Sequence, residues 1–201
     1  PGPLTMILKK SDKVPKATTG GLDTVAIRMP ADEIASALIR LSGVYVAAHS
    51  ANASGRPSTT KAEHVIEDLD GKIDMIIDGG ASEIGLESTI VDLTGEVPLI
   101  LRPGYINAEQ LAEVLGEVRF DEAVLKRSAS ENIVAKAPGM KYRHYAPKAP
   151  LYIVEGKSDE VIRYINAEAV KNAAEGRITG ILATEETKKN YTGGMVFCVG
   201  E

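Results

Sequence analysis

The chain of 201 residues contains few aromatic side chains and almost no cysteine. It has no tryptophan, two phenylalanines and one cysteine, and aromatic residues make up 4% of it. A single cysteine cannot form an internal disulfide, which is typical of a protein kept in a reducing cytosol. We therefore expect a cytoplasmic protein. Cys198 lies in an apolar run, residues 195–199, and we expect it to be an inert part of the core.

Several motifs and patterns are also missing. No apolar run approaches the ~18 residues that suggest a membrane span, so we expect no membrane partner. The chain has no Walker A lysine motif, no G-x-S-x-G motif and no Cys/His cluster with zinc-binding spacing. The three histidines do not form a Ser-His-Asp pattern. Catalysis by this chain would therefore depend on positioning and charge stabilisation, as phosphoryl and nucleotidyl transfer require, and not on an activated nucleophile.

The charge is acidic overall and uneven along the chain. The formal net charge is −5, which argues against tight general binding of nucleic acid. Residues 126–148 hold six Lys or Arg and one Glu, a net of +5, so the remainder carries −10. A basic segment on an acidic body indicates a local anionic ligand.

The chain begins at Pro1 without an initiator methionine and enters a strand-like run at once, and it ends directly after another such run. We expect it to be the middle of a longer polypeptide.

Residues 50–58, Ser-Ala-Asn-Ala-Ser-Gly-Arg-Pro-Ser, are the stretch around which the rest is organised. They lie between an apolar run at 44–47 and an expected helix at 59–69. Small residues let a ligand approach the backbone, a helix N-terminus offers free N–H groups, and the side chains add donors and the charge of Arg56. The pattern fits a phosphate or carboxylate site, but local features alone favour a polar loop that ends in a helix cap.

The residue pattern predicts an α/β fold with two sheets. We expect strands at 4–8, 24–28, 44–47, 73–77, 90–93 and 98–101, with helices at 31–41, 59–69 and 107–115, which together suggest a twisted mixed sheet with helices against it. In the helix at 59–69, Glu63, Glu67 and Asp68 are expected to face water. From residue 151 the pattern changes to strands at 151–154, 178–183 and 195–199 around a helix at 158–174, which predicts a small Rossmann-like parallel sheet. We therefore expect a catalytic domain at 1–126, a linker at 127–150 that acts as a lid, and an incomplete C-terminal domain at 151–201.

Hydroxyl groups and arginines recur at the ends of the expected strands. The candidate ligand-binding residues are Thr24, Arg28, Ser50, Asn52, Ser58, Ser88 and Arg102. Two arginines suit two anions, such as a carboxylate and a polyphosphate. For Arg28 alone, a structural salt bridge and an anionic ligand both remain open.

Five motifs occur in a known order. They are Pro1-Gly2-Pro3-Leu4-Thr5, Ser50-Ala51-Asn52-x-Ser54-Gly55, Gly85-Leu86-Glu87-Ser88-Thr89-Ile90-Val91-Asp92, Leu101-Arg102-Pro103-Gly104 and the run from Pro138 to Pro147. In this order they resemble the YrdC-like threonylcarbamoyl-adenylate synthases, in the two-domain form with a linker and a Rossmann-like C-terminal domain. The resemblance covers essentially the whole chain.

The resemblance implies a nucleotidyltransferase that makes threonylcarbamoyl-AMP and pyrophosphate from L-threonine, bicarbonate and ATP, assisted by Mg²⁺. Its product would pass to a transferase machinery that modifies tRNA, and weak binding of double-stranded RNA would accompany this role. By analogy, Arg28, Ala48 and Ser88 would bind threonine. Thr24, Ser50, Asn52, Ser58 and Arg102 would bind ATP, and Tyr145 would close over the nucleotide, ahead of Tyr142.

One departure from the family leads to a further expectation. The family carries a Lys-x-Arg pair in a segment that would lie before Pro1, so we expect this polypeptide by itself to be impaired. Three rival readings remain: a non-catalytic RNA-binding module, a relative that forms a carbamoyl adenylate for hydrogenase maturation, and a generic Rossmann enzyme with its site in the C-terminal half.

Overall fold

The computed structural model describes residues 1–126 and 149–200. The chain divides into two compact units, residues 1–147 and 148–201, and each is described by itself. The linker and lid expected at 127–150, with Tyr142 and Tyr145, lies almost entirely outside the described residues.

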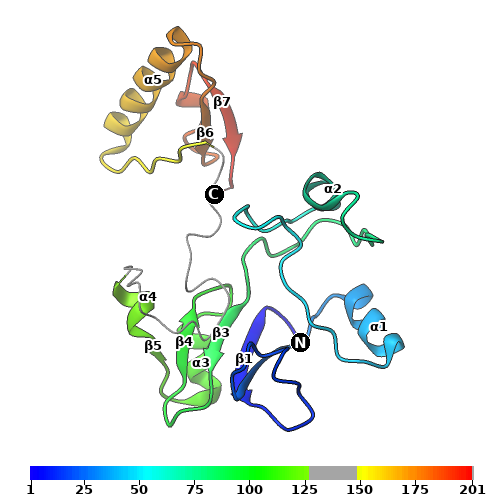
Figure 1. The fold of residues 1–201 in the computed structure, drawn as a ribbon. Coiled ribbons are helices and arrows are strands. Elements are labelled where there is room, and N and C mark those ends of the chain that lie inside the picture. The colour runs from blue at the N-terminus through cyan, green and yellow to red at the C-terminus, as the bar shows by residue number, and fades with distance from the viewer. Residues whose placement is uncertain (127–148, 201) are drawn as a thin grey trace. The chain divides into compact units, whose positions relative to one another are not determined.

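The first unit is built on a mixed sheet of five strands in the order β2-β1-β3-β4-β5 (Figure 1). The strands are β1 (Leu4–Lys9), β2 (Thr24–Arg28), β3 (Thr89–Asp92), β4 (Leu99–Arg102) and β5 (Arg119–Phe120). β1 pairs antiparallel with β2 and parallel with β3, while β3 pairs antiparallel with β4, and β4 parallel with β5. The predicted mixed sheet is therefore confirmed.

The described part of this unit holds four helices: α1 (Glu33–Ser42), α2 (Ala62–Leu69), α3 (Ala108–Leu115) and α4 (Glu122–Lys126). Leu111 of α3 packs on Val91 and Ile100, so α3 covers the face of the sheet to which these two side chains point. Ile7, Ile90 and Leu101 form a second buried cluster. Residues alternate between the two faces along a strand, and Thr5 is two residues from Ile7, so Thr5 lies on the face away from α3.

Two of the expected strands in this unit do not form. Residues 44–47 and 73–77 are irregular, and Tyr45 and Met75 are largely exposed. A strand is stabilised by a backbone partner and by packing of its side chains, and none of the described residues pairs with either segment. Apolar composition alone was therefore not sufficient to predict a strand at residues 44–47 or 73–77, and both predictions are wrong.

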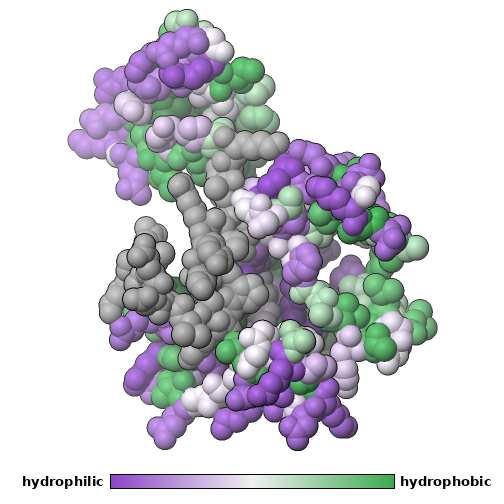
Figure 2. Space-filling model, viewed as in Figure 1, coloured by the Kyte–Doolittle hydropathy of each residue, from purple (hydrophilic) through white to green (hydrophobic). Residues whose placement is uncertain are grey.

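The helix α1 keeps an apolar face that the described residues leave uncovered. Ile34, Leu38 and Leu41 recur at helical spacing, and all three are exposed. Figure 2 shows apolar side chains on the surface over this helix. The ends of α1 are well defined, because the Asp32 carboxylate accepts the Ala35 N–H and Gly43 ends the helix in the left-handed conformation.

The second unit contains a two-stranded parallel sheet of β6 (Gly180–Ala183) and β7 (Met195–Cys198), with α5 (Ser158–Ala174) and a 3₁₀ helix, η1 (Lys188–Asn190). The parallel pairing confirms the expected small sheet. The strand expected at 151–154 is irregular, and Tyr152 and Ile153 are exposed. Cys198 is also exposed, so the expectation of an inert core thiol is wrong.

In the part of the chain that the structure describes, no helix is both long and apolar enough to cross a bilayer.

The N-terminus of α3 carries a capping box. Asn107 accepts the Gln110 N–H at 2.8 Å, and the Gln110 side chain accepts the Asn107 N–H at 3.0 Å. We expect Asn107→Ala to destabilise the first unit by about 1 kcal/mol, because one N–H of the first turn loses its acceptor. Urea unfolding, monitored through the hydrogen exchange of backbone amides in β3 and β4, measures this loss of stability. The exposed Glu113→Ala in the same helix is the control, and equal stability of the two variants would contradict the prediction.

Candidate functional site

A row of cross-strand partners connects the two candidate arginines. Arg28 of β2 lies opposite Thr5, Thr5 lies opposite Ile90, and Ile90 lies opposite Arg102. Neighbouring strands are about 4.8 Å apart, so the two arginine Cα atoms are separated by three strand spacings, about 14 Å. Because residues paired across strands share a face, the row lies on the face away from α3.

Hydrogen bonds to Ser88 join two members of this row, Thr5 and Arg102, into one polar cluster. The hydroxyls of Thr5 and Ser88 are 2.8 Å apart, and Arg102 Nη2 donates to Ser88 Oγ at 3.1 Å. Arg102 also donates from Nε and Nη2 to the Ser88 carbonyl, at 3.1 and 2.9 Å. The Ser88 side chain is buried, so its hydroxyl is held by protein groups on two sides.

Glu87 connects the cluster to the loop at residues 50–58. Its Oε2 accepts from Arg102 Nη1 at 2.6 Å, and its Oε1 accepts from Ser58 Oγ at 2.7 Å. A half-buried Arg–carboxylate pair of this kind fixes geometry more than it adds stability. Ser58, Ser88 and Arg102, which the sequence analysis selected separately, are thus brought together by a carboxylate that it did not select.

Arg28 differs from Arg102 in its surroundings. Its side chain is exposed, and no carboxylate in the described part of the chain lies within ion-pair distance of it. Of the two readings that the sequence left open for Arg28, the salt bridge is therefore not found among these residues. A cation without a protein partner at the end of a strand is suited to an anionic ligand.

The loop itself is folded around a turn. Arg56 N–H donates to the Ala53 carbonyl at 3.0 Å, and Asn52 Nδ2 donates to the carbonyls of Ala53 and Arg56 at 2.9 and 3.0 Å. The helix that follows begins at Ala62, three residues later than expected, with Lys61 as its N-cap. The hydroxyls of the loop therefore do not cap this helix.

Arg56 is not available as a free phosphate-binding charge. Its guanidinium contacts the carboxylates of Asp68 and Glu67, both on α2. Asp68 also accepts the Ala53 N–H at 2.9 Å. The expectation that Asp68 faces water is wrong, since it is 5% exposed.

Three other predicted residues are not hydrogen-bonded to this cluster. Ala48 and Ser50 are exposed in an irregular segment, and neither forms a side-chain hydrogen bond with Arg28 or Arg102. Thr24 lies opposite Lys9, at the far end of β2 from Arg28, about 13 Å away along the strand. Tyr145 lies outside the described residues.

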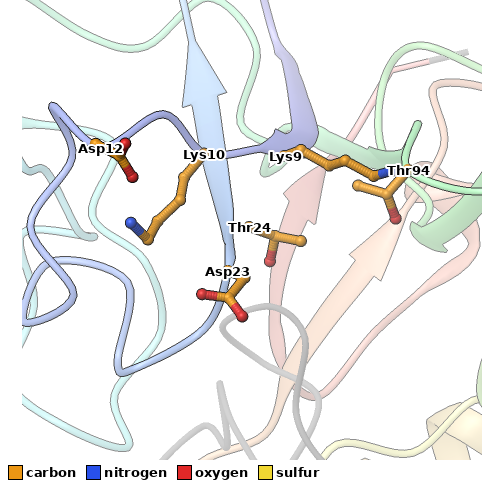
Figure 3. Close-up of a pocket in the computed structure, with 6 residues that line it drawn as sticks. All are labelled: Lys9, Lys10, Asp12, Asp23, Thr24 and Thr94. Carbon is orange, nitrogen blue, oxygen red and sulfur yellow. The ribbon is translucent and has the colours of Figure 1, made fainter.

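Thr24 lines a different hollow. A pocket of about 500 Å³ is lined by Thr24, Thr94 and four charged residues, Lys9, Lys10, Asp12 and Asp23. Figure 3 shows Lys9 extending toward Thr94 across this pocket. Two lysines and two aspartates line it, so it lacks the single sign of charge that favours a highly charged ligand.

In the second unit, polar groups gather where β6 and β7 end. Cys198 Sγ donates to Glu185 Oε1 at 2.8 Å, and Lys188 Nζ lies 2.7 Å from Glu185 Oε2. The thiol hydrogen bond and the ammonium lower the pKa of the Glu185 carboxyl, and the carboxylate raises the pKa of Lys188. All three groups are near the surface.

Three residues of the site, Thr5, Glu87 and Asp68, were not predicted from the sequence. Thr5 and Glu87 lie inside two of the five motifs, next to Leu4 and Ser88. Their position beside these motif residues could have identified them as site residues. Asp68 gave no such signal, because a carboxylate beside Glu67 on an amphipathic helix is normally solvated.

Comparison with known proteins gives two family matches. Residues 1–104 match the Sua5_yciO_yrdC family model, described as "Telomere recombination", and residues 106–200 match the model described as "Threonylcarbamoyl-AMP synthase, C-terminal domain". The whole chain is 51% identical to a Pyrococcus abyssi threonylcarbamoyl-AMP synthase and 47% identical to one from Bacillus subtilis. It spans 57% and 56% of these two relatives, a little more than half of their length.

A solved structure of P. abyssi Sua5 complexed with L-threonine superposes on the whole chain with a TM-score of 0.86 at 50% identity. The chain covers 57% of that protein.

Proposed function

Because the chain belongs to the Sua5/YciO/YrdC family, we propose that it carries out, as part of a longer protein, the synthesis of L-threonylcarbamoyladenylate. One observation of the structure carries the proposal. Arg28, whose guanidinium has no carboxylate partner among the described residues, lies in the same cross-strand row as Arg102, which is held in place by Glu87 and Ser88. Two arginines on one face, with Cα atoms about 14 Å apart, can hold a small amino acid next to a polyphosphate.

The threonine carboxylate would bind the Arg28 guanidinium, with the Ser88 hydroxyl and the backbone at Ala48 beside it. Arg28 presents a planar fork of donors, which matches both oxygens of a carboxylate. The Ser88 hydroxyl is already hydrogen-bonded to the side chains of Thr5 and Arg102. It would therefore position these two side chains in addition to contacting the ligand.

The ATP would lie along the loop, with Ser50, Asn52, Ser58 and Arg102 toward its phosphates and ribose. Asn52 Oδ1 supports this placement, because it is buried and has no hydrogen-bond partner in the described part of the chain. A buried acceptor without a donor costs free energy, and a ribose hydroxyl would supply that donor. The proposed roles of Thr24 and Tyr145 in ATP binding rest only on the family resemblance.

In the proposed reaction, the threonine amine and bicarbonate form a carbamate and release water. A carbamate oxygen then attacks the α-phosphorus of ATP, and pyrophosphate leaves. The chain contributes orientation and positive charge: Arg28 holds the amino acid, and Arg102 and the loop hold the phosphates.

Mg²⁺ is proposed to arrive bound to ATP. No group of three or more His, Cys, Asp or Glu side chains with metal-binding geometry occurs among the described residues. Mg²⁺ commonly keeps several waters and takes substrate phosphates as ligands, so the residues present fit a metal brought by the nucleotide.

The wider context is part of the same proposal. The product would pass to a cytoplasmic tRNA-modifying transferase, and the domain limits 1–126, 127–150 and 151–201 stay predictions. The RNA-binding alternative depends on the basic segment 126–148, of which the structure describes only Lys126.

The activity is tested in a hybrid in which this chain replaces the matched 57% of the P. abyssi relative. We expect release of pyrophosphate from ATP that requires both L-threonine and bicarbonate, and slower release from the 201-residue chain by itself. L-alanine in place of threonine is the control for substrate identity. A folded hybrid that releases no pyrophosphate in response to threonine would contradict the proposal.

A further inference from the structure

The loop that carries the proposed ATP-binding residues is attached to α2 by one buried side chain. Asp68 Oδ2 accepts the Ala53 N–H at 2.9 Å, and Asp68 Oδ1 accepts from Arg56 Nη1. Its side chain is 3% exposed. Both oxygens of this carboxylate are therefore bonded to the same short turn, residues 53–56.

The position of Asp68 is unfavourable on its own. It lies one residue before the end of α2, where the partial negative charge of the helix C-terminus repels a carboxylate. A buried carboxylate also loses its hydration. The contacts with the Ala53 amide and the Arg56 guanidinium offset these costs, so the carboxylate and the loop conformation depend on each other.

The attachment extends to both ends of the loop. On one side, Asn52 holds the turn through the carbonyls of Ala53 and Arg56. On the other side, Ser58 contacts Glu87, which contacts Arg102. The turn fixed by Asp68 thus lies between Asn52 and Ser58, two of the residues proposed to contact the nucleotide.

We infer that Asp68 is a positioning residue, which holds residues 52–58 in the conformation that binds ATP and has no contact with the amino acid. This rests on the proposed function. It assigns Arg56 a structural role: the guanidinium neutralises Asp68 and does not contact phosphate.

The test measures binding of a non-hydrolysable ATP analogue and of L-threonine to the full chain by calorimetry. We expect Asp68→Asn to weaken binding of the analogue about tenfold and to leave threonine binding unchanged, because the ion pair with Arg56 is lost while the side-chain volume is kept. Hydrogen exchange of the Ala53 amide should become at least tenfold faster. Asp70→Asn, a change of an exposed carboxylate two residues further on, should alter neither quantity.

Arg56→Gln separates the positioning role from direct phosphate contact. If Arg56 acts only through Asp68, then Arg56→Gln and the double variant weaken analogue binding about as much as Asp68→Asn. Effects that multiply in the double variant would show that Arg56 acts on nucleotide binding independently of Asp68, and this would overturn the inference. Because Arg56→Gln leaves Asp68 unchanged, it also tests the proposal if Asp68→Asn does not fold.

Two results distinguish failure of the inference from failure of the proposed function. A wild-type chain that binds both ligands, with Asp68→Asn behaving like Asp70→Asn, overturns the inference alone. A wild-type chain that binds neither ligand overturns the proposed function, and the inference with it. Equal weakening of threonine and analogue binding also overturns the inference, since it would indicate a general loss of structure.

Discussion

Replacing Arg28 by alanine is expected to weaken binding of L-threonine about 100-fold, or ~3 kcal/mol, the value of a lost charge-assisted hydrogen-bonding pair. The side chain lies exposed on the edge strand β2, and no described carboxylate pairs with it. Stability should therefore change by less than about 0.5 kcal/mol, as for other exposed substitutions without a special contact. Calorimetry with threonine, together with urea unfolding, measures both quantities in one variant.

Two substitutions serve as controls. Arg28→Lys keeps the charge but loses the planar fork, so we expect an intermediate affinity. Arg119→Ala removes an exposed arginine of β5 that is paired with Glu117, and it should leave threonine binding unchanged. The assignment also involves Ser88, and unchanged threonine affinity in both Arg28→Ala and Ser88→Ala would refute it.

Gly104→Ala is expected to disturb the site and the fold together. A Cβ at this position would overlap the Glu87 carbonyl oxygen, and it would lie 2.6 Å from the Thr89 nitrogen and 2.9 Å from Thr89 Oγ1. The neighbours are mostly backbone, so they cannot rotate away. The backbone of residues 87–89 must shift, at a cost of about 1–3 kcal/mol as for other overpacked positions.

The same shift moves the groups that hold Arg102. The Ser88 carbonyl accepts two hydrogen bonds from this arginine, and the Thr89 N–H donates to the Pro3 carbonyl at 3.0 Å. We therefore expect Gly104→Ala to lower the urea midpoint and to weaken binding of the ATP analogue more than tenfold. Gly95→Ala is the matched control, since the nearest atom to its Cβ would be the Val97 oxygen at 3.7 Å. Equal stability and affinity in the two variants would show that the close approach at Gly104 is unimportant.

The elements that the sequence located well are those with strong local signals. The helix at 158–174 and the strand at 24–28 were predicted with the bounds that the structure has. Periodic spacing of apolar residues is a property of a few adjacent residues, so it can be read directly. The apolar segments 44–47, 73–77 and 151–154 gave a similar signal but form no strand, because pairing requires a partner that local composition cannot supply.

The sequence by itself determined the family, through five motifs in order, and it selected both arginines and most of the hydroxyl groups around them. Only the tertiary structure decided how they are held. Glu87 and Ser88 hold Arg102, and Asp68 holds the loop, whereas no carboxylate among the described residues pairs with Arg28. It also separated Thr24 from Arg28, at opposite ends of one strand. The physical reason is that a side chain's charge and hydrogen-bonding capacity belong to the residue, whereas its partners come from segments far away in the chain, as Ser58 and Glu87 do.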